Sequence, residues 1–425
     1  MLDIQFIRDN KDLVAKKSKQ KGYEVDIDEL LRVDKQRRDL LTEIEQIRAE
    51  KNALAKSNDG ISVSRAEHSP GRDPEKIEKG KRLKEKENEL ESKLNPVSAQ
   101  IDKLLKTVPN MFPDDTPIGD ESASKEVKKW GNTGAKSFAV EDHVSWAEER
   151  GLLDFERGAK VAGNKFYFEL GGLVELEQAV FQYAMQLARQ HNFVPISVPH
   201  MVNTQIIEGT GFLAKGDEEQ IYKVQDEDLH LIATAEIPIT GFHSGEILDI
   251  NTSPKLYAGI SPAYRREAGA YGKHSKGLYR VHQFNKLELY VFCKPEDSEH
   301  WHQELLAIEE EICQALEIPY RMIRIASGDL GAPAYKKFDI EYWSPAENTY
   351  RELMSCSNVT DYQARRLAIR YRADKGKTEF VHTLNGTAAA YSRVCIALIE
   401  NHQQQDGKVQ IPAALRPYIA GQTNI

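Results

Sequence analysis

Apolar side chains recur at steps of three and four residues along two long segments near the start of the chain. In the first segment these steps pass through Leu30, Val33, Arg37, Leu40, Ile44, Ile47, Lys51 and Leu54. In the second segment they pass through Leu83, Glu87, Leu90, Leu94, Val97, Ile101 and Leu104. This spacing is typical of the contact seam of a coiled coil. Because a single loop joins the segments, we expect an antiparallel helical hairpin whose helices are each about 40 Å long, at about 1.5 Å per residue.

Helices of this length exceed what a globular core needs, which predicts an arm. The joining loop, Ser57 to Pro74, is rich in Ser, Asp, Gly and Pro. Pro96 falls inside the second helix, where it lacks an amide hydrogen and crowds the preceding turn, so we expect a kink near the base of the arm. A coiled coil that serves only to dimerise the protein is the alternative interpretation of the same pattern.

Beyond the hairpin, three prolines mark a linker and the hydrophobic pattern changes. These prolines are Pro109, Pro113 and Pro117. An amphipathic helix is predicted over Leu173 to His191, and a short Val/Ile/Pro stretch follows from Phe193 to Val202. Strand-like runs come later, at Lys255 to Ile260, Tyr279 to Cys293 and Lys337 to Trp343. Hairpin loops separate these runs more often than helices do, which indicates an antiparallel sheet. We therefore predict an α+β fold with two domains, residues 1–110 carrying the hairpin and residues 111–425 carrying an antiparallel sheet flanked by helices.

Composition places the chain among soluble globular proteins. Its 425 residues, 40% apolar and 29% charged, are enough for one large core and a second, smaller unit. No run of about 18 apolar residues occurs, and Asp3 and Asp9 near the start fit neither a signal peptide nor a transit peptide. We expect a cytoplasmic protein without a membrane segment. The cysteines, which form no CxxC pair, are Cys293, Cys313, Cys356 and Cys395. Their wide spacing predicts ordinary thiols and no zinc site.

The formal net charge of −9 argues against indiscriminate binding to polyanions. Any contact with nucleic acid must therefore be local. One concentration of positive charge consists of Lys76, Lys79, Lys81, Arg82, Lys84 and Lys86, near the loop end of the second helix. The other consists of Lys273, His274, Lys276 and Arg280. Taken alone, either cluster is more simply explained as a solvated face.

The segment from Tyr264 to Glu288 combines side chains suited to a nucleotide site. It reads Tyr264-Arg265-Arg266-Glu267, a loop with Gly269, Gly272 and Gly277, and a return run Tyr279-Arg280-Val281-His282-Gln283-Phe284 followed by Lys286-Leu287-Glu288. Alternate side chains of a strand share a face, so we expect Arg265 and Glu267 to point one way. By the same rule Phe284, Lys286 and Glu288 share a face. A guanidinium, an aromatic ring and a carboxylate on one face of the sheet could hold a triphosphate, a purine ring and a small polar ligand. Each residue alone is more often a surface charge, and only the ordered combination favours a site.

These motifs resemble those of the bacterial-type seryl-tRNA synthetases, which are class II aminoacyl-tRNA synthetases, and the resemblance covers essentially the whole chain. Phe193 to Val202 looks like motif 1 and Tyr264 to Glu288 like motif 2. Asn385-Gly386-Thr387, continuing to Arg393 and Ile399-Glu400-Asn401, resembles motif 3. Thr234-Ala235-Glu236 is similar to the serine-type triplet, and Glu352 to Asn358 to a further family block. The resemblance implies that the predicted sheet is class II synthetase-like.

The resemblance also implies an ATP site with magnesium. Arg265 would bridge the α-phosphate and the amino-acid carboxylate with a bidentate fork that lysine cannot reproduce. Phe284 would stack on adenine, and Arg393 would hold the γ-phosphate. Glu352 and Ser355 would supply hard oxygen ligands to Mg²⁺. The implied ATP-binding set is Arg265, Arg266, Glu267, Val281, Phe284, Glu352, Leu353, Met354, Ser355 and Arg393, of which Arg265, Arg393 and Glu352 are the catalytic candidates.

A serine site is implied beside the ATP site, formed by Thr234, Ala235, Glu236, Arg265, Glu288, Asn385 and Thr387. Glu288 and Thr387 would meet the ammonium and hydroxyl groups. A site built to bond a substrate hydroxyl can reject the analogue that lacks it by roughly 10⁴ to 10⁵. Without the family context, Glu288 reads as a strand-surface charge and Thr387 as a cap or turn hydroxyl.

The implied activity is that of a serine–tRNA ligase that uses ATP, L-serine and tRNA(Ser) and forms a homodimer. The arm would grip the long extra stem of tRNA(Ser) by shape and backbone contacts, because side chains cannot enter the deep groove of an RNA duplex. The loop from Gly269 to Tyr279 would guide the acceptor end. Whether tRNA(Sec) is also a substrate stays open.

Two other functions remain open from the sequence. An amino-acid ligase acting on a carrier protein would share the guanidinium, aromatic and carboxylate groups of this sheet face. Such proteins resemble this chain but lack the long arm. A non-catalytic coiled-coil tRNA-binding paralogue should have lost part of its site, whereas Arg265, Glu288, Glu352 and Arg393 are all present.

Overall fold

The computed structural model describes the chain except for residues 60–73, 135, 214–219, 269–276 and 374–375. The predicted arm tip and the loop positions Gly269, Gly272, Lys273, His274 and Lys276 therefore lie outside the described residues. Two compact units are present. The N-terminal unit comprises Asp3–Lys19 and Glu24–Val108, and the C-terminal unit comprises Met1–Leu2, Gln20–Tyr23 and Pro109–Ile425.

The N-terminal unit is helical. Its elements are α1 (Ile4–Asp9), α2 (Lys11–Gln20), α3 (Ile27–Asp59) and α4 (Pro74–Thr107). The long helices α3 and α4 run antiparallel, because Glu29 near the start of α3 accepts a hydrogen bond from Gln100 near the end of α4, at 3.1 Å. Farther along, Arg48 of α3 contacts Glu91 of α4 at 2.7 Å. The polar side chains thus confirm the direction that the joining loop predicted.

The predicted seam is the contact between α3 and α4. Its buried centre consists of Ile44, Ile47 and Leu90, with Leu40, Leu83 and Leu94 packed against them. Two of the three charged seam positions, Lys51 and Glu87, form an ion pair with each other. Opposite charges facing across the seam favour this register over its neighbours. Pro96 lies inside α4, which continues on both sides of it.

The C-terminal unit is built on a central sheet, to which eight strands contribute in the described residues, in the order β1-β10-β11-β12-β15-β9-β8-β4. Their bounds are β1 Lys125–Trp130, β10 Tyr320–Arg324, β11 Lys336–Ser344, β12 Thr349–Thr360, β15 His382–Ala390, β9 Gln283–Cys293, β8 Lys255–Tyr264 and β4 Val194–Ile196. All neighbouring pairs are antiparallel except β4 and β8, which are parallel. The prediction of a mainly antiparallel sheet is confirmed.

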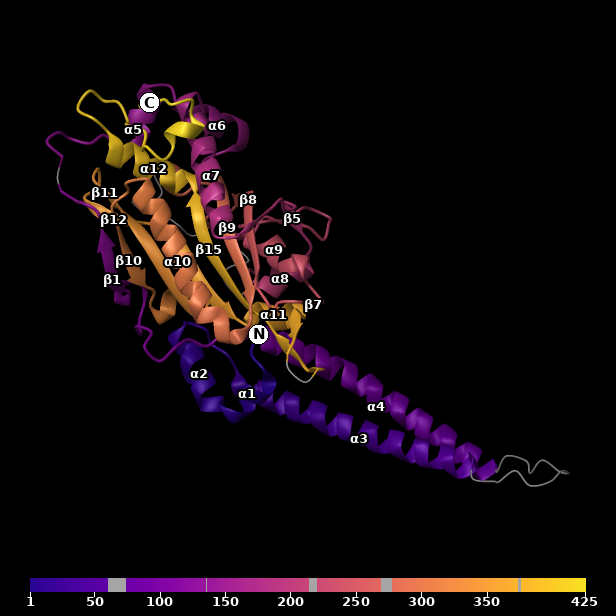
Figure 1. Cartoon of the computed structure of the whole chain (residues 1–425). Helices are drawn as coiled ribbons and strands as arrows, with labels where there is room; N and C mark the ends of the chain where they lie inside the picture. The colour runs from indigo at the N-terminus through magenta and orange to yellow at the C-terminus, as the bar shows by residue number, and fades with distance from the viewer. Residues whose placement is uncertain (60–73, 135, 214–219, 269–276, 374–375) are drawn as a thin grey trace. The chain divides into compact units, whose positions relative to one another are not determined.

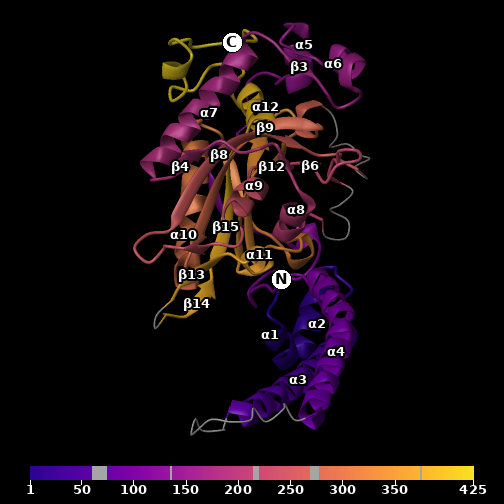
Figure 2. The same ribbon diagram turned by 90° about the vertical axis from the view of Figure 1, so that its right-hand side faces the viewer.

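Helices cover both faces of this sheet. On one face lie α7 (Gly172–Gln190), α10 (Ser298–Ala315) and α12 (Tyr391–His402), and Figure 1 shows α10 along β12 and β15. On the other lie α8 (Thr204–Thr210), α9 (Glu236–Phe242) and α11 (Tyr362–Leu367), visible in Figure 2. The predicted helix 173–191 is α7. Among the described residues, none of the helices combines the length and the apolar character needed to cross a membrane.

Strand β9 shows how the sequence distributes its side chains between the two faces. Leu287, Leu289 and Val291 pack into the core under α7, α10 and α12. Tyr290 and Phe292 pack into the second core under α8, α9 and α11. Toward the start of β9 the second face turns polar, because residues 284, 286 and 288 are Phe, Lys and Glu. One face of β9 is therefore buried in the core along the strand. The other face carries polar site residues near the start of the strand and packs into the second core near its end.

Shorter elements complete the C-terminal unit. The short strands are β2 Leu153–Asp154, β3 Phe168–Glu169, β5 Met201–Val202, β6 His230–Leu231, β7 Ile247–Leu248, β13 Arg370–Arg372 and β14 Thr378–Phe380. The short helices are α5 His143–Glu149, α6 Phe155–Ala162, and the 3₁₀ turns η1 Glu121–Ala123, η3 Gly277–Tyr279, η4 Pro295–Asp297, η5 Ser327–Asp329 and η7 Arg416–Tyr418. The turn η3 corrects the sequence prediction, since the strand expected from Tyr279 begins only at Gln283.

Candidate functional site

A cavity of about 350 Å³, here called the central cavity, opens on the α9 side of the sheet. Its lining includes the predicted site residues Thr234, Glu236, Arg265, Phe284, Glu352, Leu353, Met354, Ser355, Asn385, Thr387 and Arg393. They come from the α9 N-terminus and from strands β9, β12 and β15, with Arg265 directly after β8 and Arg393 in the first turn of α12. Segments more than 150 residues apart in sequence therefore share one cavity.

Two guanidinium groups and a carboxylate mark one end of the central cavity. Arg393 Nη1 lies 2.7 Å from Glu352 Oε1. Burial alone would raise the pKa of Glu352, but the positive charges of Arg393 and then Lys337 outweigh it and lower that pKa to about 2. Burial, reinforced by the neighbouring Arg393, lowers the pKa of Arg265. Two like charges held close together out of water favour an anionic ligand between them.

The aromatic rings of the cavity lie against these same guanidinium groups. The Cζ atom of Arg265 is 5.3 Å from the ring centroid of Phe284. The Cζ atom of Arg393 is 5.0 Å from the ring centroid of Tyr279, in η3. Both distances are within the range of cation–π contacts. Each arginine is thus fixed by an aromatic ring, and Arg393 also by an ion pair.

Glu352 and Ser355 lie three residues apart on β12, a spacing that puts side chains on opposite faces of a regular strand. The register of β12 against β11 shifts at this point, because Ile340 pairs with Met354 whereas Glu341 pairs with Glu352. Leu353 is the extra residue of this β-bulge, and bulges re-aim side chains in this way. The bulge accounts for a carboxylate and a hydroxyl that both line the cavity.

The oxygen donors at this end suit a hard divalent cation. Glu352 stays ionised because of its low pKa, and Ser355 adds a neutral oxygen beside it. Asp339 pairs with Ser355 across β11 and β12, and burial raises the pKa of Asp339 to about 7 although Lys337 opposes the shift. The donor set therefore fits Mg²⁺, which takes few protein ligands and shares others with phosphate oxygens.

The other end of the cavity is acidic and deeply buried. Glu288 is 1% exposed, forms an ion pair with Lys286, and accepts a hydrogen bond from Thr234 Oγ1 at 3.1 Å. Burial raises the pKa of Glu288, while Lys286 lowers it. Thr387 of β15 lies directly across from Glu288 in the sheet. Glu288 itself is not part of the cavity wall, but Thr234, Lys286 and Thr387 around it are.

A second carboxylate, Glu236, reaches the same end from the first turn of α9. Its Oε1 atom accepts a hydrogen bond of 2.7 Å from Nε2 of Gln363. Burial and the nearby Glu288 raise the pKa of Glu236 to about 7. Gln363 is 0% exposed and also donates to the Thr210 carbonyl at 3.1 Å. This glutamine therefore fixes one carboxylate oxygen of Glu236.

Five predicted site residues do not line the cavity: Glu288, described above, and Ala235, Arg266, Glu267 and Val281. Ala235 and Val281 are buried. The strand alternation expected for Arg265 and Glu267 is wrong, because β8 ends at Tyr264 and Glu267 has a left-handed backbone with φ of 49°. Glu267 instead pairs with Arg280, with Oε2 and Nε 3.2 Å apart.

Some lining residues escaped the sequence analysis. Lys337 lies in no motif of the sequence. Lys286 is predicted on the same strand face as Phe284 and Glu288, but the sequence indicates no function for it. The segment from Leu330 to Ala334 also lines the cavity. It is held by Lys21, whose Nζ donates to the Ala334 carbonyl at 2.7 Å, and by Asn110, whose Nδ2 donates to the Pro333 carbonyl at 2.9 Å. Burial lowers the pKa of Lys21 to about 7. Such contacts between distant segments leave no signal in one sequence.

Comparisons with known proteins agree with the geometry. The profile of the tRNA synthetase class II core domain (G, H, P, S and T) matches residues 222–402, and that of the seryl-tRNA synthetase N-terminal domain matches residues 1–112. The chain is 44% identical to the serine–tRNA ligase of Rubrobacter xylanophilus, over 99% of this chain and 98% of that protein. It is 45% identical to the serine–tRNA ligase of Dictyoglomus turgidum, over 99% and 98%. A crystal structure of seryl-tRNA synthetase from Pyrococcus horikoshii complexed with ATP has a TM-score of 0.90 and 38% identity, covering 100% of this chain and 99% of that chain.

Proposed function

We propose that the central cavity activates serine with ATP, because the chain belongs to the seryl-tRNA synthetase family and its activity is that of a serine–tRNA ligase. The observation that carries the site assignment is the grouping of Arg265, Phe284, Glu352 and Arg393 at one end of a cavity and Glu236 at the other. A triphosphate and an amino acid fit these ends because their charges are complementary.

In the first step, the serine carboxylate attacks the α-phosphorus and pyrophosphate leaves, which forms seryl-adenylate. Arg265 belongs to the end with Arg393 but also interacts electrostatically with Glu288 of the acidic end, so it would bind both the α-phosphate and the attacking carboxylate. Arg393, oriented by Glu352, binds the γ-phosphate of the departing pyrophosphate. Preorganised positive groups of this kind stabilise the charge that develops during in-line displacement. The reaction needs no nucleophile from the protein.

Mg²⁺ would be held by Glu352 and Ser355, where it would neutralise phosphate charge. Glu352 can serve because it is ionised at neutral pH.

The serine end rests on buried acceptors. Glu236 and Glu288 would attract the ammonium group, with Glu288 and Thr387 meeting the hydroxyl group. If alanine bound in place of serine, these buried polar groups would lack a hydroxyl partner. Leaving a buried polar group unpaired costs more binding free energy than losing an apolar contact.

In the second step, a ribose hydroxyl at the 3′ end of tRNA(Ser) attacks the activated carbonyl and releases AMP. The α3–α4 pair would bind the extra stem of this tRNA. Its lysines and arginine near the start of α4, Lys76, Lys79, Lys81, Arg82, Lys84 and Lys86, would contact RNA phosphates.

The working assembly would be a cytoplasmic homodimer. Strand β4 is the edge of the central sheet, and Val194 in it is 56% exposed. Ile260 in the neighbouring β8 is 38% exposed. An edge strand with apolar side chains favours pairing with a second copy. Size-exclusion chromatography with light scattering would give the mass of a dimer, and a monomeric mass would contradict the proposal.

Serine-dependent ATP/pyrophosphate exchange tests the proposed site. Across the twenty amino acids, exchange should be strongest with serine, and Arg265→Ala should abolish it. Arg157→Ala is a matched control, since Arg157 is 77% exposed, pairs with Asp154 and does not line the cavity. Retained exchange in Arg265→Ala would remove this arginine from the reaction.

A further inference from the structure

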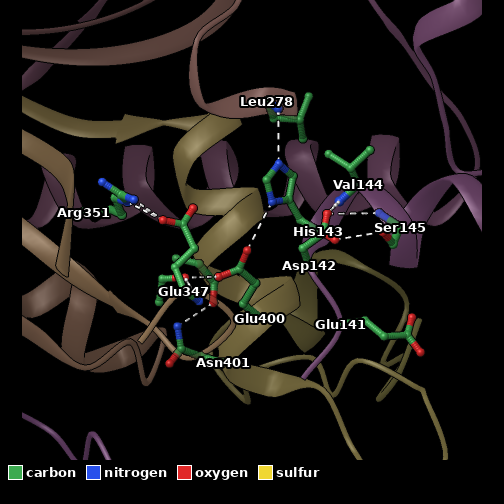
Figure 3. Close-up of polar contacts among 12 residues, drawn as sticks. Glu141, Asp142, His143, Val144, Ser145, Leu278, Glu347, Arg351, Glu400 and Asn401 are labelled. Carbon is green, nitrogen blue, oxygen red and sulfur yellow. Dashed lines mark hydrogen bonds and ion pairs between the residues drawn. The ribbon is translucent and has the colours of Figure 1, made fainter. Parts of the chain in front are cut away.

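His143 is a buried histidine outside the central cavity that connects three elements of the C-terminal unit. It is the first residue of α5 and only 7% exposed. Figure 3 shows it between Leu278, in η3, and Glu400, near the end of α12. Its Nδ1 lies 3.1 Å from Glu400 Oε1, and its Nε2 lies 3.3 Å from the backbone nitrogen of Leu278.

The partners of His143 determine its protonation state. The backbone N–H of Leu278 can only donate, so Nε2 must be the acceptor. A carboxylate oxygen of Glu400 accepts, so Nδ1 must carry the proton. His143 is therefore the neutral Nδ1–H tautomer. A second proton on Nε2 would face the Leu278 N–H donor and break the contact.

Glu400 is oriented by a further bond on its other oxygen. Ser344, at the end of β11, donates its hydroxyl to Glu400 Oε2 at 2.5 Å, and Ser344 Oγ accepts from the Glu347 backbone nitrogen at 3.3 Å. The order of groups is serine, carboxylate, histidine. This differs from a hydrolase triad, where the histidine lies between the serine and the carboxylate. Since both nitrogens of His143 are occupied, the group is suited to holding structure and not to nucleophilic catalysis.

The turn held by His143 fits closely against it. Gly277 has a φ of 66°, and a Cβ atom placed on it would lie 2.4 Å from His143 Nε2. Glycine is therefore required here for its backbone angle and also for the approach of the imidazole. Leu278 is 0% exposed and belongs to the main core. One side chain thus fixes η3 through a hydrogen bond and through contact.

The residue after Leu278 reaches the reaction site. Tyr279 places its ring 5.0 Å from the guanidinium carbon of Arg393, which pairs with Glu352 at 2.7 Å. The chain of contacts runs from His143 through the η3 backbone to the ring of Tyr279 and then to Arg393. At the serine end, Thr234 and Glu236 instead form their hydrogen bonds with Glu288, with Gln363 and with each other.

We propose that His143 is a positioning residue for the ATP end of the site: its neutral Nε2 anchors the η3 turn, so that Tyr279 holds Arg393 ready for the γ-phosphate. This inference rests on the proposed function, which assigns Arg393 to ATP. It adds a residue that touches neither substrate, and it assigns the effect to one acceptor atom.

Two substitutions separate the two hydrogen bonds of His143. In His143→Gln the amide oxygen can occupy the Nε2 position and accept from Leu278, while the bond to Glu400 is lost. In His143→Asn the amide nitrogen can occupy the Nδ1 position and donate to Glu400, while Leu278 loses its acceptor. His191→Asn is the matched control, because His191 forms an exposed contact of 3.0 Å with Glu311.

The measurement is steady-state ATP/pyrophosphate exchange with purified full-length variants. His143→Asn should raise the KM for ATP about tenfold, the expected effect of one lost hydrogen bond of about 1.4 kcal/mol, and leave the KM for serine unchanged. His143→Gln should keep a KM for ATP close to that of the wild type, even if its Tm falls. Equal effects of Asn and Gln, or no effect of either, would overturn the proposal. Absence of serine-dependent exchange in the wild type would instead refute the proposed function.

A second measurement reads the protonation of His143 directly in the wild-type protein. In the wild-type protein labelled with ¹⁵N-histidine, the His143 resonance should report a protonated Nδ1 and an unprotonated Nε2 at neutral pH, with His143→Gln used only for assignment. A protonated Nε2 would contradict the anchoring of Leu278 whatever the kinetics show.

Discussion

Gln363 offers a direct test of how the serine end is held, although it does not line the cavity. Its side chain uses every hydrogen-bonding position. Nε2 donates to Glu236 Oε1 at 2.7 Å and to the Thr210 carbonyl at 3.1 Å. Oε1 accepts from the hydroxyls of Tyr290 and Thr383, both at 2.8 Å. Gln363→Leu keeps the approximate volume and removes all of these bonds.

The expected loss of stability in Gln363→Leu follows from the buried groups that lose a hydrogen-bond partner. Tyr290 keeps a hydroxyl contact with Thr240 at 2.6 Å, whereas Glu236 Oε1, the Thr210 carbonyl and the Thr383 hydroxyl each lose a bond. At about 1–3 kcal/mol for each buried group left unsatisfied, the free energy of unfolding should fall by at least about 3 kcal/mol. A hydrogen bond to a charged group is worth about 1.5–3 kcal/mol. Misplacement of Glu236 should therefore raise the KM for serine by about tenfold or more, at about 1.4 kcal/mol per factor of ten.

The assay pairs urea unfolding with exchange kinetics. Thr383→Val is the matched control, since it removes one bond to Gln363 Oε1 and leaves the bond to Glu236 in place. It should lower stability by about 1 kcal/mol and leave both KM values unchanged. Gln363→Leu should raise the KM for serine and not that for ATP. The reasoning fails if Gln363→Leu is destabilised but binds serine like the wild type, or if both KM values rise together.

Four further predictions concern charge and the arm. Glu352→Gln should reduce exchange by about 10²–10³ and raise the Mg²⁺ concentration needed for half-maximal rate, and an unchanged Mg²⁺ titration would remove Glu352 from the metal site. Because burial raises the pKa of Glu236 to about 7, its carboxyl group should ionise near neutral pH, so the KM for serine should fall as pH rises from about 6 to about 8; Glu236→Gln should flatten this profile. The same raised pKa means that the folded state holds the proton more tightly, so the stability that Glu236 contributes is full below about pH 4.5 and is lost as pH rises through about 7; urea midpoints measured across this range should show the loss in the wild type only. Removing Asp34 to Leu104 and bridging the gap should preserve exchange and cripple tRNA charging, and unchanged charging would make the α3–α4 pair purely structural.

Local periodicity predicted the elements that depend on one segment of sequence. The steps of three and four residues placed the contact seam of α3 and α4, including the facing pair Lys51 and Glu87, because helical geometry alone decides which side chains meet. The alternation of β9 likewise placed Phe284 and Lys286 on the cavity side. The family resemblance, confirmed by the full-length relatives, named eleven of the residues that line the cavity and five that do not.

The errors and omissions arose where backbone geometry departs from regular strands. Alternation failed at Glu267, since β8 had already ended and the backbone there is left-handed. The opposite case is Ser355, which shares the cavity with Glu352 only because Leu353 forms a bulge. Neither departure has a signature in the local sequence, because neighbouring strands determine both.

Contacts over long sequence separations were equally hidden. Gln363 lies 127 positions from Glu236, and His143 lies 257 positions from Glu400. A buried glutamine or histidine carries no motif of its own, so its partners become known only once the sheet and helices bring them together.

The central claim is that one cavity holds the nucleotide and serine side by side, with Arg265 between them. A crystal structure with a non-hydrolysable seryl-adenylate analogue tests it most directly. We predict the adenine ring against Phe284, the phosphate mimic on Arg265, and the serine ammonium and hydroxyl groups among Thr234, Glu236, Glu288 and Thr387. An analogue bound elsewhere, or bound in this cavity with its phosphate mimic away from Arg265, would contradict the account.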